Sequence, residues 1–458
     1  MAGEQATEHH LFFDDALLPS GWARGVRLTI AAGRIAAVET GAAPAPGDAR
    51  HGCALPGLPN LHSHAFQRGM AGLAERRGPA GDSFWTWRET MYRFLDRMTP
   101  DDIRAVAALA YVEMLESGFT RVGEFHYLHH APGGAPYADP AETSAAIVDA
   151  AAESGIALTL LPVLYAHAGF GAQPPTPAQA RFVHDLDGYA RLLAGADAAA
   201  AHLPDAVVGV APHSLRAVSA GQLAALAPLA EGRPVHIHIA EQMKEVEDCL
   251  AWSGARPVEW LLDHAAVDAR WCLVHATHMT AGETAAMAQS GAVAGLCPIT
   301  EANLGDGLFP AEAFVAAGGR YGVGSDSNVR IDAAGELRLL EYGQRLARRG
   351  RNLLARGEGR STGTDLYAAA VEGGGAALGA PAGLTVGASA DIVSLDRDHP
   401  SLAGRDGDLL LDAFVFAAGR GAVDGVWRRG DRLVAAGRHR AREAVAARYA
   451  ATLARLLA

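Results

Sequence analysis

The sequence predicts an α/β fold, a (β/α)8 barrel joined to a small β-sandwich domain. Short, continuously apolar segments recur between residues 55 and 327, and Ala-, Leu- and Glu-rich segments of helical character separate them. Buried parallel strands are apolar on both faces, and eight of them alternating with helices are typical of this barrel. Alternating apolar and polar residues near both chain ends predict the small β domain. A doubly wound open sheet is the alternative, and the lack of a Gly-x-Gly-x-x-Gly turn after the first strand weakens it.

The small domain is expected to combine residues 1–54 with residues 380–438. Its predicted strands are residues 11–14, 26–31, 34–39, 384–396 and 424–434. Residues 41–52 are rich in Pro and Gly and predict a connector into the barrel. Residues 439–458 predict a closing amphipathic helix, because apolar side chains recur there at near-helical spacing.

The barrel is expected to occupy residues 55–379. Its predicted strands are residues 55–64, 120–127, 157–165, 206–213, 234–241, 271–277, 292–300 and 321–327. Long connections follow the first and third strands, at residues 67–98 and 166–178, and long loops at this end of a barrel usually shape the site. For the aromatic stretch 84–94, covering the site and forming a crossover or dimer surface are both open.

Composition excludes some classes of partner. The 458 residues carry a net charge of −12 without a basic run, which argues against nucleic acid or a membrane surface. The four cysteines form no Cys-x-x-Cys pair, so free buried thiols are expected. The first ten residues do not resemble a secretory leader and no apolar run is long enough to span a bilayer, so a cytoplasmic location is expected.

Histidines and an aspartate mark the ends of several predicted strands, and these ends meet on one face of the barrel. His62 and His64 point to the same side of the first strand, because residues i and i+2 share a face. The predicted metal ligands are His62, His64, His238 and Asp326. His236 shares the face of His238, which we prefer because it lies nearer the strand end. Three imidazoles and one carboxylate suit Zn²⁺, or Fe²⁺ in some proteins.

The same strand ends supply groups for hydrolysis. A divalent ion lowers the pKa of a water molecule toward neutrality, and Asp326 is placed to accept the proton. Glu241, three residues past His238, is expected to be the general acid and base. His275 is expected to stabilise charge at the attacked centre. For Glu241 the alternative is a surface or helix-capping role.

Four motifs together resemble the amidohydrolase superfamily, specifically its mononuclear metal-dependent deaminase branch. They are His62-Ser-His64 after Leu-Pro-Gly-Leu-Pro-Asn, His238-x-x-Glu241, His275 and Ser325-Asp326. The bimetal branch carries a bridging lysine at the end of the fourth strand. Here that strand ends in Ala-Pro-His-Ser, so the resemblance implies one metal ion.

Within that branch the chain is similar to the formimidoylglutamate deiminases. The similarity lies in Asn60-Leu-His-Ser-His-Ala-Phe-Gln-Arg-Gly-Met70, Phe84-Trp-Thr-Trp-Arg-Glu-Thr-Met-Tyr92, Gly123-Glu-Phe-His-Tyr-Leu-His129 and Ala211-Pro-His-Ser-Leu-Arg-Ala217. These enzymes hydrolyse N-formimino-L-glutamate to N-formyl-L-glutamate and ammonia in histidine degradation. The resemblance therefore implies a hydrolase that acts on the C–N bond of a linear amidine.

The resemblance also implies substrate contacts by Gln67, Tyr127 and His213. Arg216, just past the fourth strand, is suited to bind a carboxylate of a small anionic substrate with two hydrogen bonds. A homodimer is expected, as is common for such barrels. A deaminase of a purine or pterin is the nearest rival, and a non-catalytic barrel scaffold is a rival of another class. The roles of His126, His129 and His130 stay open, with packing in loops favoured.

Overall fold

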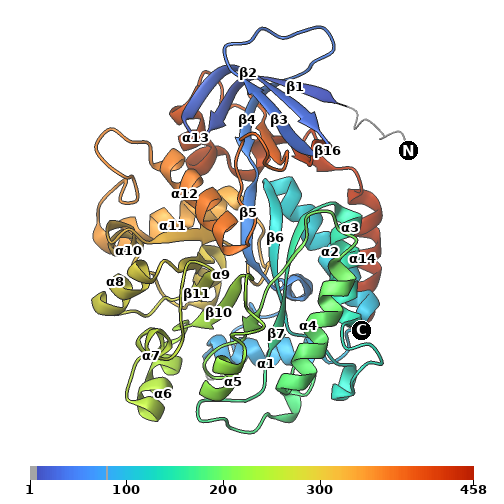
Figure 1. The fold of residues 1–458 in the computed structure, drawn as a ribbon, viewed down its shortest axis with the longest axis vertical. Coiled ribbons are helices and arrows are strands. Elements are labelled where there is room, and N and C mark those ends of the chain that lie inside the picture. Colours follow the sequence, from blue (N-terminus) through green and yellow to red (C-terminus); the bar gives the residue numbers. More distant parts are fainter. Residues whose placement is uncertain (1–7, 79–80) are drawn as a thin grey trace.

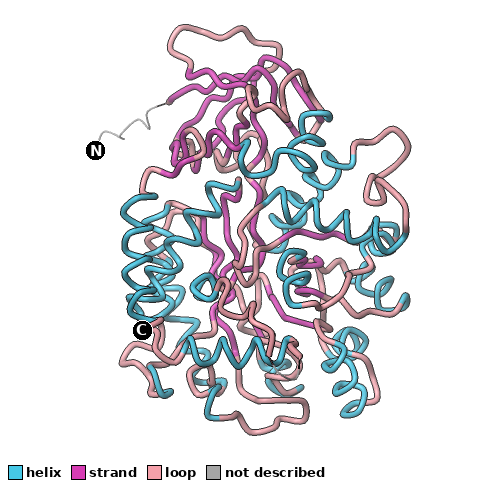
Figure 2. Tube along the Cα trace, turned by 180° about the vertical axis from the view of Figure 1, so that it is seen from behind, coloured by secondary structure: helices cyan, strands magenta, loops and turns pink. Residues whose placement is uncertain are grey.

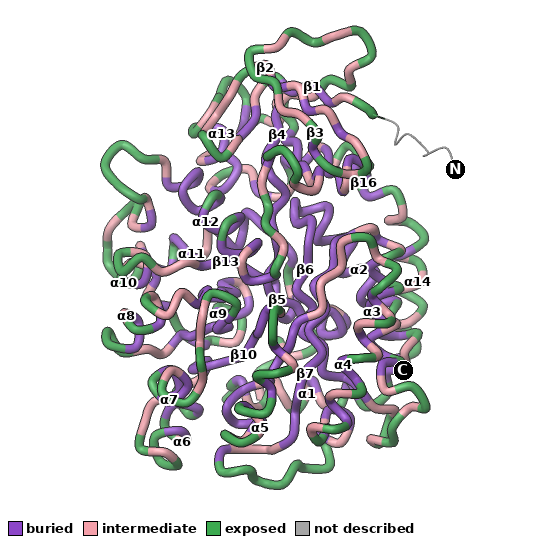
Figure 3. The backbone as a smooth tube through the Cα atoms, in the orientation of Figure 1, coloured by how far each residue is buried: buried purple, intermediate pink, exposed green. Residues whose placement is uncertain are grey.

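The computed structural model describes residues 8–78 and 81–458 (Figure 1). A mixed β-sheet at one end joins a larger body in which parallel strands run through the middle and helices lie outside them (Figure 2). The buried residues concentrate in those central strands (Figure 3). Residues 1–7 lie outside the described residues. They belong to the first ten residues, on which the expectation about a secretory leader rests.

Strands from both ends of the chain share the mixed sheet, as their alternating patterns predict. They are β1 (His9–Leu18), β2 (Gly21–Ala31), β3 (Arg34–Glu39), β4 (Ala49–Pro56), β14 (Ile392–Leu395), β15 (Val423–Arg428), β16 (Asp431–Ala435) and β17 (Arg438–His439). The hydrogen-bonded order is β17-β16-β15-β14-β4-β1-β2-β3, one continuous path. Only β1 and β4 pair in parallel.

Two expectations for this sheet were wrong in their limits. The predicted connector 41–52 ends early, because β4 begins at Ala49 and pairs with β1. The predicted strand 384–396 is reduced to β14. The amide of Ala388 donates to the carbonyl of Thr385 and Gly387 has a φ of 86°, so the residues before β14 form a turn despite their alternating pattern.

Parallel strands of the larger body form two sheets. One contains β5 (Leu58–Ser63), β6 (Phe119–His126), β7 (Ala157–Leu164), β8 (Val207–Val208) and β9 (Ala211–Pro212). The other contains β10 (Val235–Ile239), β11 (Trp271–His275), β12 (Val293–Leu296) and β13 (Arg320–Val323). Each of the eight predicted apolar segments contains or overlaps a strand. Isolated parallel bridges join the sheets on both sides, Val210 to Val235 and Ser63 to Asp326.

The predicted first strand, residues 55–64, is in fact two strands that meet at Gly57. The Gly57 amide donates to the carbonyl of Asp391 beside the mixed sheet, and the next amide, of Leu58, donates to Gly118 beside β6. A side chain at position 57 would meet the Thr120 hydroxyl at 2.2 Å. Glycine therefore lets the chain cross from one sheet to the other in close contact with β6.

The helices are α1 (Phe84–Leu95), α2 (Pro100–Ser117), α3 (Glu142–Ser154), α4 (Leu186–Ala200), α5 (Ala220–Ala225), α6 (Met243–Ser253), α7 (Pro257–His264), α8 (Ala281–Ser290), α9 (Pro298–Leu304), α10 (Ala311–Ala316), α11 (Ala333–Arg348), α12 (Thr362–Ala377), α13 (Asp408–Ala413) and α14 (Arg442–Leu456). The predicted closing helix is α14, which lies along α2 (Figure 1). Arg442 forms an ion pair of 3.1 Å with Glu116 there.

Two expectations from composition were tested. All four cysteines are free and buried, as predicted. No helix within residues 8–78 and 81–458 is long and apolar enough to cross a membrane.

Candidate active site

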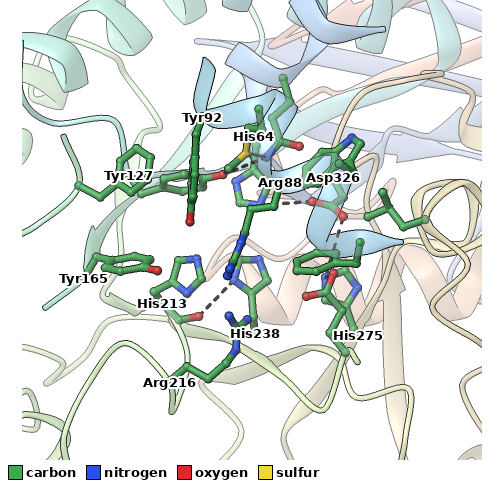
Figure 4. A pocket seen from close by; sticks show the side chains of 17 residues that line it. His64, Arg88, Tyr92, Tyr127, Tyr165, His213, Arg216, His238, His275 and Asp326 are labelled. Carbon is green, nitrogen blue, oxygen red and sulfur yellow. Dashed lines mark hydrogen bonds and ion pairs between the residues drawn. The ribbon is translucent and has the colours of Figure 1, made fainter. Parts of the chain in front are cut away.

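Four strand-end side chains converge on one point. His62 lies in β5 and His64 directly follows that strand, His238 lies in β10, and Asp326 lies in the loop after β13. The Nε2 atom of His62 lies 3.2 Å from that of His64 and 3.0 Å from that of His238. Asp326 Oδ1 lies 3.5 Å from His62 Nε2 and 3.3 Å from His64 Nε2. The structure thus brings the whole predicted ligand set together (Figure 4 labels three of the four).

The protons on these rings show why the cluster suits a cation. His64 donates through Nδ1 to the carbonyl of Phe125 at 2.8 Å, and His238 donates through Nδ1 to the carbonyl of His213 at 3.1 Å. Their Nε2 atoms therefore carry lone pairs, and both of these atoms lie next to the Nε2 atom of His62. Burial lowers the pKa of His62 to about 3, so this ring too is neutral. Three neutral imidazole nitrogens beside a carboxylate are a donor set that fits a divalent ion.

Hydrogen bonds between β5 and the loop after β13 fix this geometry. Asn60 donates to the Ser325 hydroxyl at 2.6 Å and accepts from the Ser325 amide at 3.0 Å. Asn328 donates to the carbonyls of His64 and Asp326 at 3.1 and 3.0 Å. Asp326 and Asn328 have left-handed φ angles of 44° and 55°, so the backbone is strained at the residue that supplies the carboxylate.

Glu241 and His275 lie beside the ligands. His275 Nε2 is 3.8 Å from Glu241 Oε1 and 3.9 Å from Asp326 Oδ2. Burial raises the pKa of Glu241 to about 7. Burial alone would lower the pKa of His275, but the charges of Glu241 and Glu301 raise it to about 10. The pair therefore offers a carboxyl that can change protonation near neutral pH and a cation that stays protonated.

Glu301 was not predicted, yet it sets the orientation of His275. Its Oε1 atom accepts from His275 Nδ1 at 3.3 Å and from the Cys297 amide at 2.8 Å. The ring therefore presents Nε2 to Glu241. The signal available in the sequence was the position of Glu301 just past the seventh strand.

His236, His129 and His130, whose roles the sequence left open, make contacts outside the ligand cluster. His236 donates through Nε2 to the carbonyl of Ala377 at 2.7 Å and so faces α12. His129 and His130 contact the carbonyls of Val163 and Val183 at 3.0 and 2.9 Å. These contacts agree with the expected packing role. Both ring nitrogens of His126 are buried without a hydrogen bond inside the described chain.

The predicted substrate residues line one pocket above the cluster. They are Gln67, Tyr127, His213 and Arg216. Gln67 Nε2 donates to the Tyr127 hydroxyl at 3.0 Å, whereas Gln67 Oε1 is buried without a partner among the described residues. The Arg216 guanidinium is buried too, and its Nε atom has no acceptor in residues 8–78 and 81–458. The pocket therefore holds an acceptor and a cation that need a ligand.

Helix α1 supplies a second cation that sequence reasoning missed. Phe84, Trp87, Arg88, Met91 and Tyr92 line the pocket from this helix. Of the two interpretations left open for residues 84–94, the structure supports a site-covering role. The missed signal is that Arg88 falls on the same helical face as apolar residues one turn before and after it.

Comparisons with known proteins agree with this site. The model of the amidohydrolase family matches residues 53–433, and that of the formimidoylglutamate deiminase HutF N-terminal domain matches residues 9–52. A formimidoylglutamate deiminase of Pseudomonas aeruginosa is 53% identical over 455 residues, covering 98% of this chain and 99% of that protein. A 5-methylthioadenosine/S-adenosylhomocysteine deaminase of Natronomonas pharaonis is 29% identical, covering 81% and 79%.

Solved structures show the same fold. The crystal structure of an amidohydrolase from Brucella melitensis superposes with a TM-score of 0.96 at 55% identity, covering 98% of this chain and all of that one. An adenosine deaminase from Xanthomonas campestris, at 22% identity over 98% of both chains, reaches a TM-score of 0.81. With the family model matching residues 53–433, this chain belongs to the amidohydrolase family.

Proposed function

We propose that this chain hydrolyses N-formimino-L-glutamate to N-formyl-L-glutamate and ammonia, a step of histidine degradation. One observation carries the proposal: a pocket lined by His64, His238 and Asp326 also contains two arginines, Arg88 and Arg216. The substrate has one amidine carbon and two carboxylates, which matches a hydrolytic centre beside two cations. The formimidoylglutamate deiminase of Pseudomonas aeruginosa, which is similar to this chain over almost its whole length, supports the same activity.

The residues of the pocket have defined roles in the proposed reaction. Arg216 and Arg88 bind the carboxylates, Tyr127 and His213 contact the substrate, and the Gln67 carbonyl oxygen accepts a hydrogen bond from a formimino N–H. The metal ion, held by His62, His64, His238 and Asp326, makes water nucleophilic at neutral pH when it is bound.

Proton transfers complete the reaction. Asp326 takes the proton from water as its oxygen adds to the formimino carbon. Glu241 passes a proton to the imino nitrogen, and His275 donates a hydrogen bond that stabilises charge on the added oxygen. Asp326 then passes the proton that it took from water to the same nitrogen, and the carbon–nitrogen bond breaks, so ammonia leaves. The added hydroxyl returns its proton to Glu241, and its oxygen stays as the formyl carbonyl.

Zn²⁺ is the proposed ion, with Fe²⁺ as the alternative, because three imidazoles and one carboxylate accept either. Elemental analysis of the purified protein distinguishes them. An ion content below about a tenth per chain after zinc is supplied would favour a non-catalytic scaffold.

The finer architecture belongs to this proposal. The two parallel sheets form one closed (β/α)8 barrel of residues 55–379, supported by the bridges at Val210 and Ser63. Residues 1–54 and 380–438 form the small β-sandwich unit, and residues 439–458 the closing helix. The homodimer and the cytoplasmic location stay predictions, and sedimentation of the purified protein tests the former.

The activity is tested by ammonia release from N-formimino-L-glutamate, with guanine and 5′-methylthioadenosine as rival substrates. We expect release from the first only, loss of release after chelation, and recovery on adding zinc. Release from a purine and not from N-formimino-L-glutamate would overturn the proposal in favour of the rival deaminase.

A further inference from the structure

Tyr165 lies in the pocket wall but has no role so far. It follows β7 directly, its side chain is buried, and its ring centroid is 4.6 Å from that of His213. Figure 4 shows its hydroxyl turned toward the interior of the pocket, which Arg88 and Arg216 also line. The question is where the proton of this hydroxyl goes.

Gln179 decides the hydrogen bonding of Tyr165. Its Nε2 atom donates to the Tyr165 hydroxyl oxygen at 2.7 Å. Its Oε1 atom accepts from the Thr176 amide at 2.8 Å and from the Thr176 hydroxyl at 3.0 Å. A backbone N–H can only donate, so the opposite orientation of the Gln179 amide would set two donors against each other. The NH₂ group therefore faces Tyr165.

The Tyr165 hydroxyl consequently accepts from the protein and keeps its own proton for another partner. No acceptor for that proton lies within hydrogen-bond distance in the described part of the chain. Three other buried tyrosines differ, since Tyr127 donates to the sulfur of Met91, Tyr189 to the carbonyl of Pro162 and Tyr367 to that of Pro56. The Tyr111 hydroxyl also lacks a partner among the described residues, but Tyr111 does not line the pocket. A buried donor directed into a pocket without an acceptor indicates that a ligand supplies one.

The charge around Tyr165 indicates which ligand this is. Burial opposes the charged form of Arg216, but the charges of Glu245 and Glu241 raise the pKa of its guanidinium, and its Nε atom has no acceptor within the described residues. Burial raises the pKa of Tyr165 while both guanidinium groups oppose that rise, so the hydroxyl stays protonated at neutral pH and lies within their field. Two cations and one neutral O–H donor in the same pocket suit a carboxylate, which accepts several hydrogen bonds at once.

We propose that Tyr165, oriented by Gln179, donates a hydrogen bond to a substrate carboxylate and so helps select anionic amidines. The inference rests on the proposed function and adds two residues to it. Tyr165 is a binding residue, and Gln179 is a positioning residue that acts through it. The connection 166–178 therefore has a role in the site, because Thr176 lies in it and fixes the orientation of the Gln179 amide.

The test compares Y165F, Q179E and the double variant with Y342F, which removes an exposed hydroxyl on α11. KM and kcat are measured with N-formimino-L-glutamate, and binding of glutarate is measured by calorimetry. For Y165F we expect KM and the glutarate Kd to rise about tenfold, since a hydrogen bond to a charged group contributes ~1.5 kcal/mol or more. We expect kcat to change less than about threefold, and Y342F to match the parent.

Q179E distinguishes orientation from packing. A glutamate at 179 still accepts from Thr176, but its second oxygen accepts the Tyr165 proton, so the hydroxyl no longer donates into the pocket. Q179E should weaken glutarate binding as Y165F does, although the phenol is intact. In the Y165F background, Q179E should raise the glutarate Kd by less than about a further threefold. A loss of binding caused only by the added negative charge would instead be as large in that background as in the parent.

N-butylformamidine, an amidine without carboxylates, serves as the comparison substrate, and we expect equal kcat/KM for the parent and Y165F. An unchanged glutarate Kd in Y165F, or equal losses on both amidines, would overturn the role of Tyr165. A parent protein that binds glutarate but releases no ammonia from N-formimino-L-glutamate would overturn only the proposed function. A parent that does not bind glutarate would overturn the carboxylate site itself.

Discussion

Glu241 faces His275 across 3.8 Å in a buried setting, and its pKa is raised to about 7. A carboxyl with such a pKa can both accept and donate a proton near neutral pH. Replacement by glutamine keeps the size of the side chain and removes the titratable carboxyl group.

We expect E241Q to lower kcat by ~10²–10⁴-fold and to leave the metal content unchanged, because Glu241 is not among the ligands. E247Q, an exposed glutamate on α6, is the matched control and should behave as the parent. Ammonia release and elemental analysis of the same preparation are the measurements. Full activity of E241Q would contradict the role given to this residue.

Arg216 illustrates a second effect at the residue scale. Its buried guanidinium lacks an acceptor for Nε inside the described residues, and a lysine at this place offers a point charge without the planar pair of donors. We expect R216K to raise KM for N-formimino-L-glutamate by at least about tenfold with a smaller change in kcat, since 1.4 kcal/mol corresponds to a factor of ten.

The exposed Arg191 on α4 provides the control substitution, R191K, which should leave steady-state kinetics as they are. A loss confined to kcat in R216K would mean that Arg216 acts on the chemistry instead of on carboxylate binding.

Single residues were predictable where their neighbours in sequence constrained them. His62 and His64 were found because strand parity places i and i+2 on one face, and His238 and Asp326 because strand ends converge. Arg88 was not found, because only the packing of α1 over the pocket brings it there. Tyr165 and Gln179 were missed because their significance lies in which proton has no acceptor, which a sequence does not record.

At the scale of elements, the contact between β5 and the loop after β13 holds His62 and His64 against Asp326. Asn328 connects them with three donated hydrogen bonds, to the carbonyls of His64 and Asp326 and to the Ser63 hydroxyl. It does so with a left-handed backbone. Asn328 itself is not in the ligand set.

We expect N328A to lower metal affinity by ~10–100-fold, because groups that orient ligands affect affinity to this extent. Competition with a chromogenic chelator measures it. N303A, on α9, removes an asparagine whose amide contacts Glu75 at 2.8 Å near the surface, and it should retain the parent affinity. Unaltered affinity in N328A would show that the two strand ends hold together without this side chain.

The sequence predicted most strands and helices, but not the residues at which they begin and end. Continuous apolar runs revealed the parallel strands because both faces of such strands are buried. The passage of the chain from one sheet to the other at Gly57 could not be predicted, because Leu55 and Leu58 belong to one apolar run. Which sheet each joins depends on pairing with β14 and β6, far along the chain.

At the scale of the whole molecule, buried ionisable groups should make stability depend on pH in two opposite ways. Glu124 is buried on β6, and burial raises its pKa from about 4.5 to about 8. The folded chain binds this proton more tightly, so the stabilising contribution is complete below pH 4.5 and is lost as pH rises toward 8. His184 has its pKa lowered by burial to about 4, so its contribution is complete above pH 6.5 and is lost as pH falls toward 4.

The unfolding temperature of E124Q relative to the parent should therefore rise by at least ~2 °C between pH 5 and pH 8. For H184Q the relative unfolding temperature should fall over the same interval, which makes the two variants controls for each other. Thermal unfolding followed by circular dichroism is sufficient. A change of the relative unfolding temperature in the same direction for both variants would contradict the pKa shifts given for Glu124 and His184.

The contact between Asn60 and Ser325 joins residues that are 265 positions apart in the chain. Synthesis at ~5–20 residues per second separates their emergence from the ribosome by tens of seconds. During that interval His62 and His64 exist without Asp326, and for most of it also without His238. The complete predicted ligand set therefore exists only after nearly three-quarters of the chain has been translated.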